Sequence, residues 1–327
     1  EKKLEVLPPR ALPEIAIWHP QHGVATIDDW KISWNRQWPV VAVIFYRAHL
    51  QAGKTAVFDT LWEALSKHNL NPLPVALTSL KDPLCMATLQ QLCADHHARL
   101  ALNTTAFCVA AIHNDGDNDT AHTPLIGNAP VLQVILSGGD RETWLADSQG
   151  LNPRDIAMQV ALPEVDGRII TRTISFKALA YHCEKTQADV VLYQADAERV
   201  AFVAELASRW CRLQTTANAE KRIGLILANY PAKEGRIGNG VGLDTPNSAV
   251  NILRMLEREH YTTGNIPTNG ETLMQELLTG ITNDAEQWPK RPARQSFALS
   301  DYLKLFAQLP QANRNAINER WGAPDTD

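Results

Sequence analysis

Three polar stretches of the chain hold the residue types that bind ligands or transfer protons. They are AHLQAGKT (48–55), ALPEVDGR (161–168) and NYPAKEGRIGNGVGLDTP (229–246). Each combines charged side chains with glycine and borders a run that is typical of a strand or helix. The chemistry of this protein is therefore expected in turns that regular elements hold in place.

The first stretch follows the apolar run VVAVIFY (40–46), so Arg47 and His49 stand where open α/β sheets bind ligands. The stretch also fits a loose phosphate-loop pattern ending in Gly53-Lys54-Thr55. A phosphate loop needs small residues in its turn, and an NTPase needs an acid that ends a later strand to hold magnesium. The turn instead holds His, Leu and Gln, and no later strand supplies that acid convincingly. We expect an ordinary strand–helix turn rather than an ATP site.

In the second stretch, Glu164 and Asp166 flank a single valine and precede a glycine turn. Two acids this close can bind a cation or move a proton, because their repulsion raises one pKa. An acidic turn before an edge strand explains the same pattern. Both interpretations stay open at this point.

The third stretch has four glycines within eight residues, which gives its backbone access to positive φ angles. Backbone amides near a helix start, together with Arg236, could form an anion site. Asn239 and Asp244 lie in the same loop. The order of the glycines does not match the dinucleotide fingerprint.

Other metal-like patterns are incomplete. His-Pro-Gln-His (19–22) offers two histidines but no third ligand in view. The acidic segment 113–130 lacks the glutamate that closes an EF-hand loop, so we expect an exposed loop. The five cysteines are odd in number and form no C-x-x-C, which predicts free thiols.

The composition is that of an ordinary core-forming chain. Of its 327 residues, 45% are hydrophobic and 20% are charged, with a formal net charge of −5. This charge gives no support to general binding of nucleic acids or anionic membranes. No apolar run approaches the roughly 18 residues of a membrane span.

Short apolar runs alternate with helix-like runs along the first part of the chain. EIAIW (14–18), VVAVIFY (40–46) and VALTSL (75–80) are typical of buried strands, and TAVFDTLWEALSKH (55–68) has apolar residues at helical spacing. This alternation predicts parallel sheets with helical crossovers. We expect an α/β fold with several Rossmann-like or flavodoxin-like units and a short helical C-terminal part.

Polar breaks divide the chain into expected regions. They are a first α/β unit at 1–112, an exposed loop at 113–130, a second α/β unit at 131–220 and a third α/β unit with C-terminal helices at 221–327. The third unit is expected to begin with a buried strand, RIGLILANY (222–230), and to continue with helices at 245–261 and 269–281. The abrupt ends, Glu1 and an acidic GAPDTD, suggest part of a longer chain.

Four motifs together resemble one family. They are FYRAHLQAGKTAVFDTLWEAL (45–65), ALPEVDGRIITRTISFK (161–177), ANYPAKEGRIGNGVGLDTPNSAVNILRML (228–256) and RWGAP (320–324). They are similar to the large subunit of aerobic cobaltochelatase, the CobN family, which is related to the porphyrin-binding subunit of magnesium chelatase. The resemblance runs from about residue 14 to residue 324 and implies an N-proximal part of a longer protein.

The resemblance implies a subunit that binds a corrinoid or other tetrapyrrole and takes Co²⁺ as its metal substrate. The implied tetrapyrrole is hydrogenobyrinic acid a,c-diamide, a precursor in cobalamin biosynthesis. ATP would be hydrolysed by an AAA+ motor of two smaller cytoplasmic subunits, with no cofactor held by this part. A non-catalytic scaffold that docks the motor, or a porphyrin-binding subunit of the magnesium chelatase type, is the alternative.

Carried onto the matching motifs, the resemblance also implies roles for individual residues. Arg47 and Arg236 would anchor the substrate, with Asn239 and Asp244 in the same binding loop as Arg236. The residues expected to handle protons or metal are His49, Glu164 and Asp166.

Overall fold

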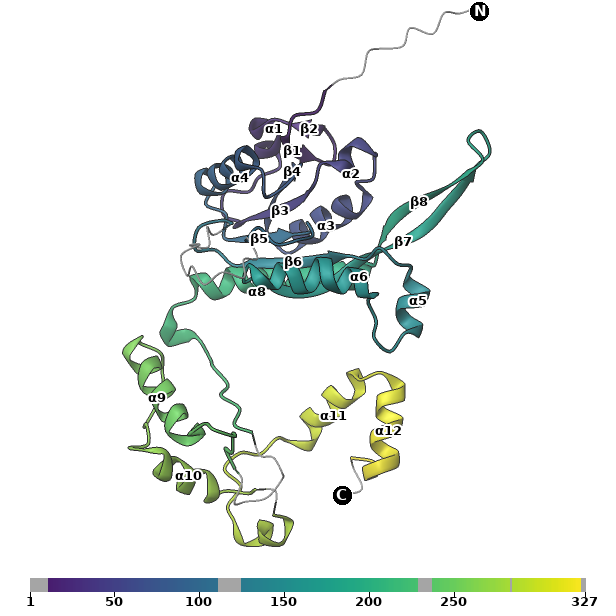
Figure 1. Ribbon diagram of the computed structural model, residues 1–327. Helices are drawn as coiled ribbons and strands as arrows, with labels where there is room; N and C mark the ends of the chain where they lie inside the picture. Colours follow the sequence, from purple (N-terminus) through teal and green to yellow (C-terminus); the bar gives the residue numbers. More distant parts are fainter. Residues whose placement is uncertain (1–10, 111–124, 229–236, 283, 325–327) are drawn as a thin grey trace, which may run out of the picture. The chain divides into compact units, whose positions relative to one another are not determined.

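The computed structural model describes residues 11–110, 125–228, 237–282 and 284–324 (Figure 1). The chain divides into two compact units, residues 1–215 and residues 216–327. The first carries all the named strands of the described residues, and the second is built from helices and loops. The α/β class expected from the sequence is confirmed.

One eight-stranded sheet, in the order β2-β1-β4-β3-β5-β6-β7-β8, forms the centre of the first unit. The five central strands β4, β3, β5, β6 and β7 run parallel, which is the strand order of flavodoxin-like folds. Antiparallel strands complete both edges. The strands are β1 (Ile15–His19), β2 (Gly23–Ala25), β3 (Val40–Tyr46), β4 (Asn71–Leu77), β5 (Leu100–Asn103), β6 (Val131–Leu136), β7 (Ile169–Cys183) and β8 (Ala188–Ala195).

The regions 1–112 and 131–220, which the sequence separates, contribute to this same sheet. Strand β5 pairs with β6 in parallel, with Ala101 opposite Val131 and Leu102 opposite Leu132. The intervening polar segment looked like a boundary between domains. It instead connects two strands that are neighbours in one sheet. Without this pairing, β5 and β6 would each be an edge strand with unpaired backbone groups.

Helices cover both faces of the sheet. Apolar residues of α3 and α8 pack on one face, while Trp30 of α1 and three residues of α4 pack on the other. The strand residues between these layers are buried, as the sequence predicts for a parallel sheet. The helices of this unit are α1 (Ile27–Ile32), α2 (Ala48–Gln51), α3 (Ala56–Lys67), α4 (Pro83–Asp95), α5 (Arg141–Ala146), α6 (Pro153–Ile156), the π-helix η1 (Ala157–Ala161), α7 (Leu162–Val165) and α8 (Ala197–Thr215).

The second unit contains the expected helices but not the expected strand. Residues 222–228 form no strand, and Ile226 is 94% exposed. A strand needs a neighbour to take its backbone hydrogen bonds. The described bonds include one to this segment, from the N–H of Gly238 to the carbonyl of Ala228 at 2.8 Å, and the isolated bridge between Gly240 and Leu243 does not involve it. The remaining elements are η2 (Asn218–Glu220), α9 (Thr245–Arg258), α10 (Gly270–Leu278), η4 (Ala285–Lys290), α11 (Leu299–Gln308) and α12 (Gln311–Trp321).

None of the helices in the described ranges is both long and apolar enough to cross a lipid bilayer. All five cysteines are free thiols, as predicted, and four of them are buried.

Candidate functional site

The carboxyl ends of the parallel strands meet at the edge where the sequence predicts a ligand site. From β3 the chain crosses to β4 on one side of β3, and from β4 it crosses to β5 on the other side. The order in which strands are added to the sheet therefore reverses beside β3. Open α/β sheets bind their ligands at such a switch point. A cavity of about 240 Å³ lies there and is lined by Tyr46, Ser79, Leu80, Lys81, Ala106, Phe107, Cys108, Val109 and Arg168.

Asp166 holds the wall of this cavity in place. Its carboxylate accepts hydrogen bonds from the backbone N–H groups of Val109 (2.8 Å) and Ala110 (2.9 Å). It also forms an ion pair with Arg168, with 2.6 Å between Oδ2 and Nη2. These three contacts occupy both carboxylate oxygens, so Asp166 positions a loop and a cation.

Arg168 is a site residue that the sequence reasoning did not single out. Its side chain is buried, and Nη1 donates to Oε1 of Gln133 at 3.2 Å. Its Nε is buried without a hydrogen-bond partner among the described residues. Burial lowers the pKa of the guanidinium, and the neighbouring Asp166 acts in the opposite direction. An Arg two residues after a candidate acid was the signal available in the sequence.

Glu164 does not join Asp166 in an acid pair. It lies on the short helix α7 and is exposed. Its carboxylate makes no ion pair or hydrogen bond with the described residues. Asp166 is directed to the loop at 109–110, so the two acids have different surroundings despite their spacing of two.

His49 lies on α2 in an aromatic environment. Its ring centroid is 5.1 Å from that of Phe58, 5.5 Å from that of Tyr193 and 6.5 Å from that of Phe45. Burial lowers the pKa of the imidazole, which favours its neutral form. None of these aromatic residues contacts Asp166. The structure therefore does not bring His49 and Asp166 together through shared neighbours.

Arg47 binds the segment that leads into β1. Its Nη1 donates to the carbonyl oxygens of Leu12 and Pro13, each at 3.0 Å, and lies 3.4 Å from Oε1 of Glu14. The guanidinium expected to anchor a substrate therefore has three partners within the protein.

The Gly-Lys-Thr turn does not have the arrangement of a phosphate loop. Its first part is the helical turn α2, where a phosphate loop would present successive free N–H groups. Nζ of Lys54 donates to the carbonyl of Val191 in β8 at 2.9 Å. The Lys54 side chain thus ties this turn to the edge of the sheet.

The candidates of the third stretch belong to the second unit. Asp244 is the N-cap of α9 and accepts a hydrogen bond from the backbone N–H of Asn247 at 3.2 Å. Hydrogen bonds from Asn247 lower the pKa of its carboxyl. Asn239 is exposed between two glycines, while Arg236 lies outside the described residues.

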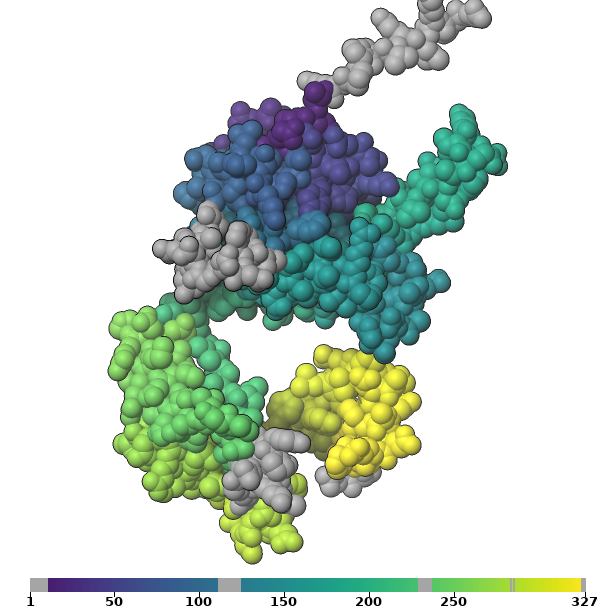
Figure 2. Space-filling view, viewed as in Figure 1, coloured from purple at the N-terminus to yellow at the C-terminus, as the bar shows by residue number. Residues whose placement is uncertain are grey.

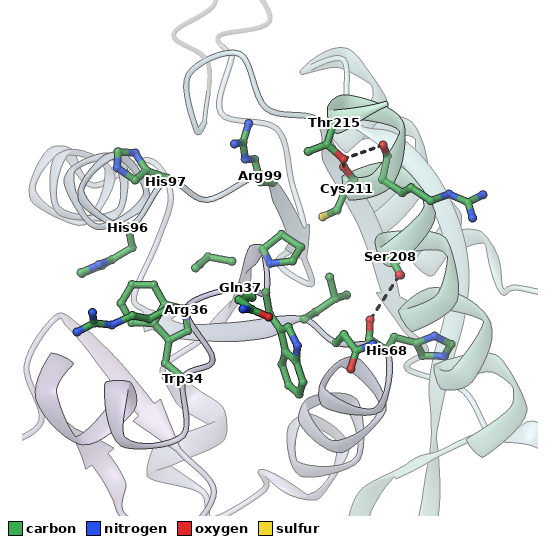
Figure 3. A pocket seen from close by; sticks show the side chains of 16 residues that line it. Trp34, Arg36, Gln37, His68, His96, His97, Arg99, Ser208, Cys211 and Thr215 are labelled. Carbon is green, nitrogen blue, oxygen red and sulfur yellow. Dashed lines mark hydrogen bonds between the residues drawn. The ribbon is translucent and has the colours of Figure 1, made fainter. Parts of the chain in front are cut away.

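A larger cavity opens at the opposite, amino edge of the sheet (Figure 3). It has a volume of about 650 Å³ and no acidic residue in its lining. His68 and His96 cap the C-termini of α3 and α4 there. The backbone N–H of each histidine donates to carbonyl oxygens in the last turn of its helix, so both residues have a structural role at these helix ends. The lining residues are Trp34, Arg36, Gln37, Trp38, Pro39, Val40, His68, Asn69, Leu70, His96, His97, Arg99, Ser208, Cys211, Arg212 and Thr215.

Within the described ranges, no group of three or more His, Cys, Asp or Glu side chains is arranged to hold a metal ion. His19 and His22 do lie side by side, with ring centroids 4.7 Å apart. Nδ1 of His19 accepts from the backbone N–H of Gln21 at 3.1 Å, and Nε2 lies 3.3 Å from Oγ of Ser33. Both ring nitrogens of His19 are therefore used within the protein.

Comparison with known proteins identifies the family. The sequence profile of the family described as CobN/Magnesium Chelatase matches residues 1–327. The chain belongs to this family. It is 50% identical to the aerobic cobaltochelatase subunit CobN of Pseudomonas aeruginosa over 98% of its length, and 26% identical to a magnesium-chelatase subunit of Chlorobaculum parvum over 99%.

A solved structure supports the same assignment. The catalytic subunit of cobaltochelatase from Mycobacterium tuberculosis matches 98% of this chain with a TM-score of 0.72 and 30% sequence identity. The chain spans 25% of that protein and 25% of each of the two relatives above. The likeness to the CobN/magnesium chelatase family therefore concerns about a quarter of each of these proteins.

Proposed function

We propose that this chain is an N-proximal part of the large, tetrapyrrole-binding subunit of a cobaltochelatase. The observation that carries the proposal is its 50% identity to an aerobic cobaltochelatase subunit over nearly its whole length. The identity to a magnesium-chelatase subunit is about half as high, at 26%. This difference favours Co²⁺ as the metal substrate, and the proposed tetrapyrrole is hydrogenobyrinic acid a,c-diamide.

The reaction requires three physical steps. Co²⁺ must lose water, the inner nitrogens of the macrocycle must give up the N–H proton that the metal replaces, and the macrocycle must distort to admit the ion. Carboxylates can take up protons or hold a hydrated metal ion, and guanidinium groups can pair with the carboxylates of the macrocycle. ATP hydrolysis that drives the distortion is assigned to two smaller AAA+ subunits in the cytoplasm.

Among the candidates, the available groups differ. Glu164 has an exposed carboxylate that can meet a substrate, and Asn239 has an exposed amide. Asp166 is paired with Arg168, and the guanidinium of Arg168 lines the cavity of about 240 Å³ at the carboxyl ends of the strands. Arg47 must first release residues 12–14, and His49 must leave its aromatic contacts, before either can act on a substrate. We therefore rank Glu164 ahead of His49 as a proton acceptor, and keep Arg236 and Asp244 as candidates of the second unit.

A reconstituted complex tests the function. The full-length subunit, the two motor subunits, ATP and hydrogenobyrinic acid a,c-diamide are mixed with Co²⁺ or Mg²⁺, and insertion is followed by absorbance. We expect insertion of Co²⁺ and at least about ten-fold slower insertion of Mg²⁺. Preferential insertion of Mg²⁺ would contradict the metal assignment, and failure with both metals would contradict the function.

The role of this part is tested by binding. Quenching of tryptophan fluorescence by the tetrapyrrole is measured for the full-length subunit and for its Glu164→Gln variant. A proton-handling role predicts slower insertion by Glu164→Gln with little change in affinity. Unchanged insertion would favour the alternative, in which this part is a scaffold for the motor.

A further inference from the structure

Strands β7 and β8 form a ribbon that extends beyond the rest of the sheet. Figures 1 and 2 show it as a narrow arm projecting from the body of the first unit. The pairing of β7 with β6 ends at Ser175, and the N–H of Lys177 still donates to the carbonyl of Gly139. From Ala178 outward, β7 pairs only with β8 among the described residues.

The register of the ribbon places its outer side chains on two different faces. Directly opposite residues of an antiparallel pair share a face, and successive residues along a strand alternate between the two faces. The extra residue Ala180 forms a bulge, so Leu179 and Tyr181 lie on opposite faces although they are two residues apart. One face, which we name the apolar ribbon face, consists only of residues without charge. Its members are Ala178, Tyr181, Cys183, Ala188, Val190 and Leu192.

The other face is of mixed character. It carries Leu179 and Val191, followed by His182 and Asp189, whose Nδ1 and Oδ1 atoms lie 2.7 Å apart. Nearer the body, this face is covered, because Tyr193 packs against the core that contains α3 and α8. At the base of the apolar ribbon face, Phe176 packs against Trp144 of α5 with ring centroids 5.0 Å apart.

Beyond this base, the apolar ribbon face is partly open to solvent, with Tyr181 and Ala188 exposed and its other members half-buried. Tyr181 is 57% exposed, and its ring stacks on no other aromatic ring of the described residues. An isolated two-stranded ribbon is marginally stable in water, and an aligned apolar face on one is a common sign of a docking surface. The uniform absence of charge predicts an apolar partner surface.

We propose that the apolar ribbon face docks on a later part of the same large subunit. This inference rests on the proposed function, since the relatives that match 98% of this chain are about four times as long. The size of the face favours this occupant. Six small or medium side chains fall well short of the roughly 800 Å² that each partner buries in a stable complex. A surface on the same polypeptide needs less area, because the chain connection raises its effective concentration.

Cys183 provides a reporter on this face. It is the one cysteine of the five that is not buried, and hydrogen bonds from Thr186 lower the pKa of its thiol. Burial raises the pKa of the Cys93 thiol to about 12 and that of Cys211 to about 11. N-ethylmaleimide should therefore react at Cys183 first whenever the apolar ribbon face is open.

The experiment measures alkylation of Cys183 in the full-length subunit by peptide mass spectrometry, relative to the rate in urea. Docking predicts at least about ten-fold protection in the wild type. Tyr181→Ser removes the largest ring of the face and should lose most of this protection. Leu179→Ser is the matched control on the opposite face and should keep it. Both variants leave the charge near the thiol unchanged.

Each other outcome contradicts the proposal. Rapid alkylation in the wild type would show an open face. Protection that grows with protein concentration would indicate a second copy, and protection that requires the motor subunits would indicate those subunits. Equal loss in both variants would indicate unfolding of the ribbon rather than undocking. Tetrapyrrole binding and metal insertion are measured separately, so failure of the proposed function is distinguishable from failure of docking.

Discussion

Residues 40–46 and residues 222–228 are both strand-like apolar runs, yet only the first forms a strand. Strand β3 lies between β4 and β5, with Val43 opposite Pro74 on one side and Leu102 on the other. Residues 222–228 have no such neighbours among the described residues of the second unit, and Ile226 is almost fully exposed. An apolar run gives a segment the capacity to form a strand, and neighbouring strands decide whether it does.

The largest effect should come from opening the core of the first unit. Phe58 is 2% exposed and stacks on Phe45, with ring centroids 4.0 Å apart. We expect Phe58→Ala to lower the free energy of unfolding by about 4 kcal/mol, because it leaves a cavity. The matched change Ile226→Ala in the second unit should alter it by less than about 0.5 kcal/mol. Urea unfolding followed by circular dichroism measures both, and similar losses would refute the contrast between the units.

A slightly smaller effect should separate the two acids of the second polar stretch. Asp166→Ala leaves Arg168 as a buried cation without its partner and should cost about 3 kcal/mol. Glu164→Ala should cost less than about 0.5 kcal/mol, because its side chain is exposed. The same urea titration checks both. A neutral Asp166→Ala would mean that the acid does not hold the cavity wall.

The smallest effect concerns the dependence of stability on pH. Burial lowers the folded-state pKa of His49 below the ordinary value of 6.5, so the unfolded chain binds more protons in mildly acidic solution. The contribution of His49 to stability is complete above pH 6.5 and is lost as the pH falls from there toward the folded-state pKa. One proton contributes at most about 1.4 kcal/mol per pH unit.

His49→Phe keeps an aromatic ring in place but removes this titration. We expect it to flatten the loss of stability between about pH 7.5 and about pH 5.5. His19 and His96 also have pKa values lowered by burial, so part of the slope should remain. Urea titrations at a series of pH values measure the slope, and a slope identical to that of the wild type would contradict the lowered pKa of His49.

Local sequence predicted local structure well. The helix at α3 follows from apolar residues at helical spacing, and α4 begins with Asp82 as its N-cap and proline in its first turn, which is a local sequence signal. The expected helix at 245–261 is confirmed as α9, which Asp244 caps by accepting a hydrogen bond from the N–H of Asn247.

The candidate site was predicted less completely. The sequence correctly placed Arg47 and His49 just after β3, yet it could not show that one binds residues 12–14 and the other packs among aromatic rings. It also missed Arg168. A buried cation is recognised by its partners, and Gln133 lies 35 residues from Arg168 in the chain.

The sequence by itself determined the α/β class, the types of most elements in the first unit, the helices at 245–261 and 269–281, and the family. Helical spacing, strand-like runs and capping residues act within a few residues and therefore appear in any short window of the chain. Tertiary structure decided what those windows do together. It joined two expected units into one sheet, and it bound Asp166 to backbone groups 56 and 57 residues away. Such contacts depend on how strands far apart in the chain pair, and no local pattern records that choice.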